Sequence, residues 1–116
     1  MLKPYIQAFG YAFEGIAAFI KTERNAKVHL AASVSAVCLG VYLELLLPEW
    51  LWIASAVVSV LICEMINSAI EKLCNHITQE IDQQIKTIKD ISAGFVLLAS
   101  LYALLVAAII FLPKVL

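Results

Sequence analysis

The hydrophobic positions of this chain form one interrupted segment followed by three long and largely continuous ones. Between residues 2 and 22, apolar side chains recur at helical spacing with charged residues set between them. The segments 28–47, 50–72 and 91–112 each approach or exceed the roughly 20 apolar residues that a helix needs to cross a bilayer. The pattern predicts an amphipathic helix lying at a membrane interface, followed by three transmembrane helices.

The remaining residues connect these elements within a single domain that covers residues 1–116. Residues 1–25 are expected to hold the interfacial helix and the start of a polar junction, and residues 73–89 a cytoplasmic loop. The composition supports a membrane location, because 63% of the residues are hydrophobic and only 15% are charged. The predicted fold class is therefore an all-α integral membrane protein.

The charges orient the chain and exclude one class of partner. The net charge is −1, and no basic run with interleaved aromatic residues is present, so a nucleic-acid-binding function is not expected. All Lys and Arg residues except Lys114 fall on the side of the N-terminus and the 73–89 loop. The positive-inside rule places that side in the cytoplasm. The cysteines, three in number, have no disulfide or metal-ligand spacing.

Polar residues gather on one face of the second predicted span. Glu64, Asn67, Glu71 and Asn75 fall within a stripe about 80° wide on an α-helix. A carboxylate inside a membrane costs about 2.5 kcal/mol or more, so such a residue is first interpreted as functional. The alternative is a buried polar seam that only fixes helix packing. His29, in the first span, is expected to be a packing residue on a stripe of small side chains.

The depths of these carboxylates suit phosphoryl transfer to a lipid alcohol. Glu64 lies below the cytosolic surface, and Glu71 lies about 10 Å nearer the cytosol. Glu64 could accept the proton of a lipid hydroxyl, while Glu71 and Glu23 could bind Mg²⁺. Lys89 could contact a phosphate, and Asp90 could accept a hydrogen bond from a ribose or orient Lys89. No Walker or kinase-type glycine-rich loop is present.

Several short motifs carry a resemblance to a known family. They are Gly10 and Gly15, Thr22-Glu23-Arg24-Asn25, Glu49-Trp50, Glu64-x-x-Asn67-x-Ala69-Ile70-Glu71, Lys89-Asp90-x-x-Ala93-Gly94 and Ile110-Phe111-Leu112-Pro113-Lys114. With these motifs the chain resembles, over nearly its whole length, the prokaryotic integral-membrane diacylglycerol kinase and undecaprenol kinase family. His29, four residues after Asn25, and the Phe-Leu-Pro-Lys ending resemble the undecaprenol kinase branch more closely.

The resemblance implies an enzyme, a lipid kinase of the bacterial inner (cytoplasmic) membrane that uses Mg²⁺ and ATP to phosphorylate undecaprenol or diacylglycerol. It also implies a homotrimer whose active sites are shared between subunits. Carried over by motif position, the catalytic residues would be Glu64 as base and Asn67 beside it. The Mg²⁺ ligands would be Glu23 and Glu71. The nucleotide-binding residues would be Gly10, Tyr11, Glu23, Glu71, Lys89 and Asp90.

Two positions depart from the family pattern. Asn75 stands where the family usually has Asp, which keeps an acceptor oxygen but removes a charge. The loop also has Ile81-Asp82-Gln83 where the family commonly has a His-Pro sequence. Two other function classes stay open from the residues alone: a small ion- or proton-conducting subunit, since intramembrane carboxylates also mark ion pathways, and a structural assembly protein without kinase activity.

Overall fold

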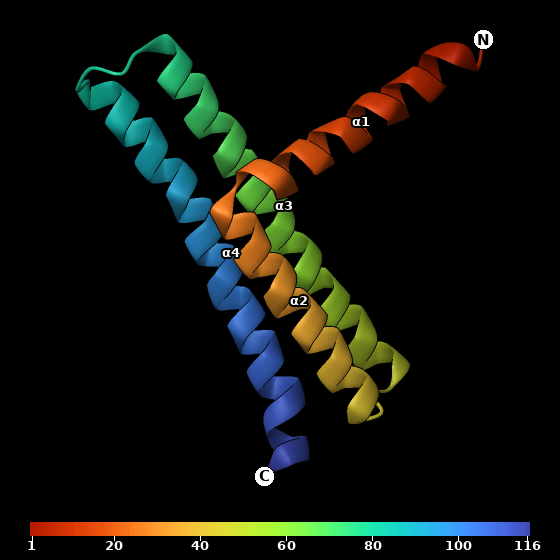
Figure 1. Cartoon of the computed structure of the whole chain (residues 1–116). Helices are drawn as coiled ribbons and strands as arrows, with labels where there is room; N and C mark the ends of the chain where they lie inside the picture. Colours follow the sequence, from red (N-terminus) through yellow and green to blue (C-terminus); the bar gives the residue numbers. More distant parts are fainter.

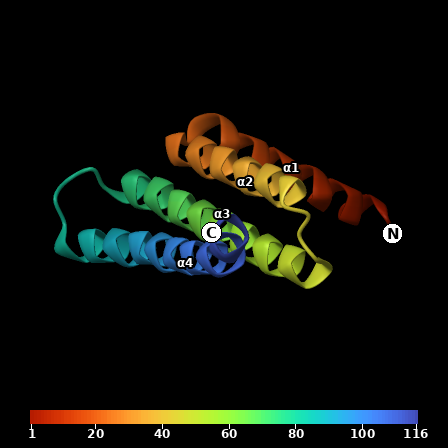
Figure 2. The ribbon, with the colours of Figure 1, turned by 90° about the horizontal axis from the view of Figure 1, so that it is seen from below.

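The chain folds entirely into helices joined by short turns. The computed structural model describes all of residues 1–116. Its elements are α1 (Lys3–Thr22), α2 (Arg24–Tyr42), α3 (Leu47–Ile77) and α4 (Gln83–Val115). The last three helices run side by side, each antiparallel to the next, while α1 projects away from them (Figure 1, Figure 2). The prediction of an all-α fold is confirmed.

Two of the four helices, α3 and α4, are long and apolar enough to cross a membrane. The helix α2 does not reach that standard, because its first turn carries Arg24 and Lys27 and it ends at Tyr42. The predicted span continued to residue 47, but the chain turns before that, with Glu44 at a positive φ of 54°. The third membrane crossing therefore stays a prediction.

The segment 73–89, expected as a loop, is mostly helical. α3 continues to Ile77 and α4 begins at Gln83, so that only residues 78–82 connect them. The early start of α4 has a local cause in Asp82, whose Oδ1 accepts hydrogen bonds from the backbone N–H groups of Gln84 (2.9 Å) and Ile85 (3.0 Å). This is the usual way in which an aspartate satisfies the free N–H groups at the start of a helix.

The helix α4 also extends beyond its expected end. The predicted span ended at residue 112, but Pro113 lies inside the last turn and the helix runs on to Val115. Proline has no N–H to donate to the carbonyl of Ile109, but the helix continues after it, and the Leu116 N–H donates to the Leu112 carbonyl at 3.0 Å.

The packing core lies between α3 and α4, which form the most extensive contact in the chain. At the end farther from the α1–α2 corner, one buried cluster joins them to the turn after α2; its members are Leu45, Ile53, Ala56, Val106, Ile110 and Phe111. At this same end Lys114 forms an ion pair with Glu49 at 3.3 Å. Only 16 of 116 residues are buried, so the apolar surface that is left needs lipid or protein to cover it.

The end of α2 approaches α3 so closely that one position has no room for a side chain. A methyl group added at Gly40 would lie 2.7 Å from Cη2 of Trp50 and 2.9 Å from Cδ1 of Leu45. Gly40→Ala is therefore expected to destabilise the protein, because overpacking typically costs about 1–3 kcal/mol and outweighs a gain in helix propensity of at most about 1 kcal/mol.

Gly94 provides the matched control for this substitution. It also lies inside a helix, but a methyl group added there meets nothing within 4 Å. Gly94→Ala should keep or raise the midpoint of thermal unfolding in detergent, whereas Gly40→Ala should lower it. Equal midpoints for the two variants would show that the α2–α3 contact is looser than described.

Candidate active site

The buried polar residues of the chain are concentrated on one stretch of α3. Glu64, Asn67 and Ser68 are buried there, and the fourth buried polar residue, Ser92, faces them from α4. Burying unpaired polar groups is costly, so each of these side chains should have a partner. The partners come from α2, from α4 and from the α1–α2 corner, which makes this stretch of α3 the meeting point of the fold.

Glu64 is the most deeply buried charged residue, with 3% of its surface exposed. Its Oε2 lies 3.2 Å from Nε2 of His29 on α2. Oε2 is otherwise completely buried and accepts no hydrogen bond of good geometry. The sequence interpretation of His29 as a packing residue missed this contact, because spacing within α2 does not show which α3 residue it will face.

Asn67 and Asn75, the two amides of the polar stripe, each bind a residue of α4. The Ser92 hydroxyl, which is fully buried, donates to Oδ1 of Asn67 at 2.8 Å. Farther along the helix, Nζ of Lys89 donates to Oδ1 of Asn75 at 2.6 Å. Asn75, the departure from the family pattern, therefore holds one of the predicted nucleotide-binding residues in place.

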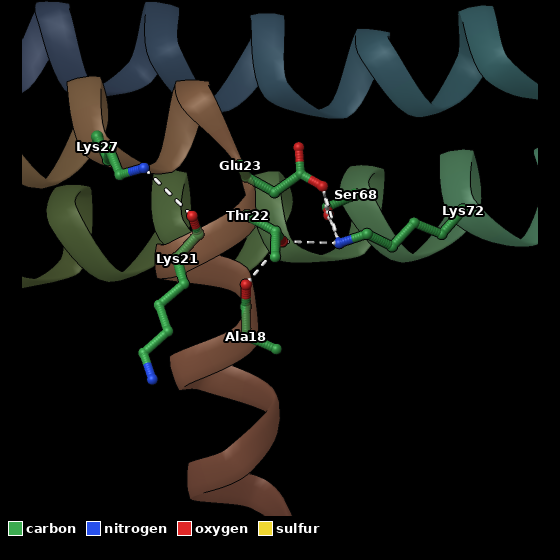
Figure 3. A network of polar contacts seen from close by, with 7 residues as sticks. All are labelled: Ala18, Lys21, Thr22, Glu23, Lys27, Ser68 and Lys72. Atoms are coloured by element: carbon green, nitrogen blue, oxygen red, sulfur yellow. Dashed lines mark hydrogen bonds and ion pairs between the residues drawn. The ribbon is translucent and has the colours of Figure 1, made fainter.

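Glu23 is the residue at which α1, α2 and α3 meet (Figure 3). It breaks the helix between α1 and α2 with an extended backbone (φ −101°, ψ 122°). Its Oε1 accepts a hydrogen bond from Ser68 Oγ at 2.7 Å and lies 2.9 Å from Nζ of Lys72. Lys72 also donates to Thr22 Oγ1 at 3.2 Å. The corner between α1 and α2 is thus fixed to α3, and the second carboxylate oxygen of Glu23 points away from this network (Figure 3).

These contacts keep Glu23 ionised. The hydrogen bond from Lys72, followed by that from Ser68, holds the pKa of the Glu23 carboxyl below its ordinary value of 4.5. A carboxyl whose pKa is lower in the folded state than in the unfolded state stabilises the fold above the unfolded value. That stabilisation is lost as the pH falls below about 4.5 and through the lowered pKa.

Acid titration should make the Glu23 contribution visible. The difference in thermal midpoint between wild type and Glu23→Gln is expected to be constant from neutral pH down to about 5 and to shrink below about 4.5. In Lys72→Met the carboxyl keeps only its contact with Ser68, so the total shrinkage should be smaller and should be complete at a higher pH than in wild type. A difference that does not change down to pH 3 would contradict the assigned pairing.

The other predicted site residues at this end are exposed. Glu71 lies on α3 one turn after Ser68, the residue whose hydroxyl donates to Glu23. Asp90 pairs with Lys86 at 2.7 Å, so the contact that orients Lys89 comes from Asn75 instead. Asn75 and Lys89 line a polar hollow of about 340 Å³ at the end of the α3–α4 hairpin where residues 78–82 connect the two helices.

The structure does not bring two predicted nucleotide-binding residues to this site within one chain. Gly10 and Tyr11 lie on the projecting part of α1, where every residue before Phe19 is exposed (Figure 1). A methyl group added at Gly10 would meet nothing within 4 Å. Neither residue therefore touches Glu64, Glu71 or Lys89 in a single subunit.

The donor set for a metal is small. No group of three or more His, Cys, Asp or Glu side chains is positioned to hold a metal ion. The chain offers Glu23, with one free oxygen, and the exposed Glu71 beside Ser68. Two carboxylates are insufficient for a closed protein site, but they match Mg²⁺, which commonly takes one or two carboxylates together with phosphate oxygens and water.

The sequence is similar to that of proteins in a known family. The chain matches the family model of prokaryotic diacylglycerol kinase over residues 10–111. It is 32% identical over 113 residues to the undecaprenol kinase of Bacillus subtilis, covering 97% of this chain and 92% of that protein. It is 30% identical over 112 residues to the diacylglycerol kinase of Synechocystis sp., covering 94% of this chain and 63% of that protein. The predicted family is confirmed: this chain belongs to the prokaryotic diacylglycerol kinase family.

Proposed function

We propose that the protein is a membrane lipid kinase that transfers the γ-phosphoryl group of ATP to the hydroxyl of undecaprenol or diacylglycerol. The observation that carries the proposal is the buried carboxylate of Glu64, 3% exposed, on a helix long and apolar enough to cross a membrane. Family membership and the names of the two relatives support the same reaction.

Glu64 serves as the base in this reaction. Phosphoryl transfer needs little covalent help from a protein, so positioning and charge stabilisation dominate. Glu64 accepts the proton as the lipid oxygen bonds to the γ-phosphorus and ADP leaves. Asn67, held through its Oδ1 by Ser92, keeps its amide N–H groups available to the reacting oxygens.

The nucleotide end of the site lies toward the cytoplasm. Glu23 and Glu71 would hold Mg²⁺, which would supply positive charge to offset the negative charge of the phosphates. Lys89, held at the hollow beside Asn75, supplies a cation for phosphate oxygens, and Asp90 accepts a hydrogen bond from the ribose. Gly10 and Tyr11 contact the nucleotide from α1.

A homotrimer with shared sites accounts for two features of the single chain. The side of α1 that carries Gly10 and Tyr11 is exposed and distant from the carboxylates, and a neighbouring subunit could bring it to them. Much of the apolar surface of α2, α3 and α4 is also exposed. We assign the protein to the bacterial inner membrane with a cytoplasmic N-terminus, with α1 at the interface and α2 as a third crossing, on the distribution of its cations.

Purified protein in micelles with labelled ATP tests the proposal directly. Undecaprenol and diacylglycerol are supplied separately, and label is expected in at least one lipid with Mg²⁺ and in neither with a chelator. Absence of label in both lipids, with the oligomer intact by size-exclusion chromatography, would exclude the kinase. Proton or cation flux into vesicles by the same preparation would then favour the ion-conducting alternative.

A further inference from the structure

The contact between His29 and Glu64 is the one buried charged contact of the chain that the proposed mechanism leaves unused. Oε2 of Glu64 is completely buried, and the imidazole Nε2 at 3.2 Å is the only donor near it. An ionised carboxylate in that position without a partner would cost several kcal/mol of desolvation and would keep a proton instead. A base that retains its proton cannot accept another from the lipid.

His29 is the only titratable residue that lines the groove beside this pair. His29 lies at one end of an apolar groove of about 380 Å³ between α2, α3 and α4. All of its other lining residues are neutral, and most are apolar. The nearest polar pair along α3, Asn67 with Ser92, is also neutral, and Lys72 is engaged by Glu23.

We propose that His29 is the positioning residue of the phosphoryl transfer: it holds the Glu64 carboxylate ionised and oriented, so that Glu64 can accept the proton of the lipid hydroxyl and later release it to water. The inference rests on the proposed lipid kinase function. The imidazole suits this role because it contacts a buried oxygen on one side while 23% of its side-chain surface stays exposed. Histidine is also the side chain that most readily gains and loses a proton near neutral pH.

The proton balance closes over one turnover. Before transfer His29 is an imidazolium with a proton on Nε2 facing Glu64, and Glu64 is a carboxylate. The pair is therefore neutral overall. The O–H bond of the lipid alcohol breaks, its proton binds Glu64, the lipid oxygen bonds to the γ-phosphorus and the bond to ADP breaks. When the products leave, Glu64 releases this proton to water, and the imidazolium stays beside the carboxylate throughout. This restores the starting state.

The experiment compares His29→Ala, His29→Gln and the control His76→Ala, which removes the exposed histidine at the end of α3. For His29→Ala we expect kcat to fall about tenfold or more while KM for Mg-ATP changes by less than about twofold. Added imidazole should restore part of kcat, because the vacated space opens onto the groove. His76→Ala should match wild type, and His29→Ala should add no loss in a Glu64→Gln background.

Infrared spectroscopy supplies a readout that does not need activity. The carbonyl band of a protonated carboxylic acid should appear at neutral pH in His29→Ala, and Glu64→Gln in the same background should abolish it. An unchanged kcat, or a loss without imidazole rescue and without this band, would overturn the inference. If His29→Ala does not assemble, His29→Gln decides by its kcat, its KM and the same band. A wild type without kinase activity would instead contradict the proposed function.

Discussion

Glu64→Gln is expected to abolish lipid phosphorylation while leaving nucleotide binding nearly intact. The substitution keeps the shape of the side chain but removes its ability to accept a proton, and general-base catalysis typically contributes about 100- to 10,000-fold. The carboxyl is buried beside His29 and far along α3 from the polar hollow at Lys89, so binding of ATP should not depend on its charge.

The measurement is kcat for each lipid together with the dissociation constant of a nucleotide analogue. Glu44→Gln is the matched control, because it makes the same change at an exposed residue in the turn between α2 and α3. Turnover within about tenfold of wild type in Glu64→Gln would show that another group accepts the proton.

Glu71→Gln is expected to raise the Mg²⁺ concentration needed for half-maximal activity by more than about 100-fold. Loss of an outer partner of a metal ligand typically costs about 10- to 100-fold in affinity, and loss of a direct carboxylate ligand should exceed that. The chain offers only Glu23 as a second carboxylate beside it, and one oxygen of Glu23 is already engaged by Ser68 and Lys72.

The assay is a titration of Mg²⁺ at saturating ATP and lipid, with Glu44→Gln again as the control. Glu23→Gln should raise the requirement as well, and it should also lower the thermal midpoint, because its carboxylate fixes the α1–α2 corner to α3. An unchanged Mg²⁺ requirement in Glu71→Gln would remove this residue from the proposed metal site.

Periodicity along the chain was sufficient for the helices and for the polar face of α3. Glu64 and Asn67 are buried on the same side of that helix, as their spacing indicated. Helix ends were predicted less well, because they depend on local caps: Asp82 starts α4 well before the apolar segment begins, and the turn at Glu44 ends α2 early. Hydropathy indicates which residues lie in lipid, whereas a helix can extend past the membrane at either end.

Contacts between helices could not be predicted, because they depend on the rotation and register of one helix against another. His29 was interpreted as a packing residue until α2 was placed against Glu64. Asn75 was identified only as a departure from a pattern, whereas the structure pairs it with Lys89. The distance of Gly10 and Tyr11 from the carboxylates likewise depends on the direction in which α1 leaves the corner at Glu23.

The unequal hydrophobicity of the helices has a consequence for how the chain enters its membrane. The pair α3 and α4 is strongly apolar and closely packed, and Glu49 and Lys114 join its ends, so this hairpin can insert and hold its place by itself. The helix α2 carries the polar residues Arg24, Asn25 and Lys27 in its first turn. It is held by contacts with α3, such as that of His29 with Glu64. Although the ribosome delivers α2 first, its stable packing should follow the later synthesis of α3.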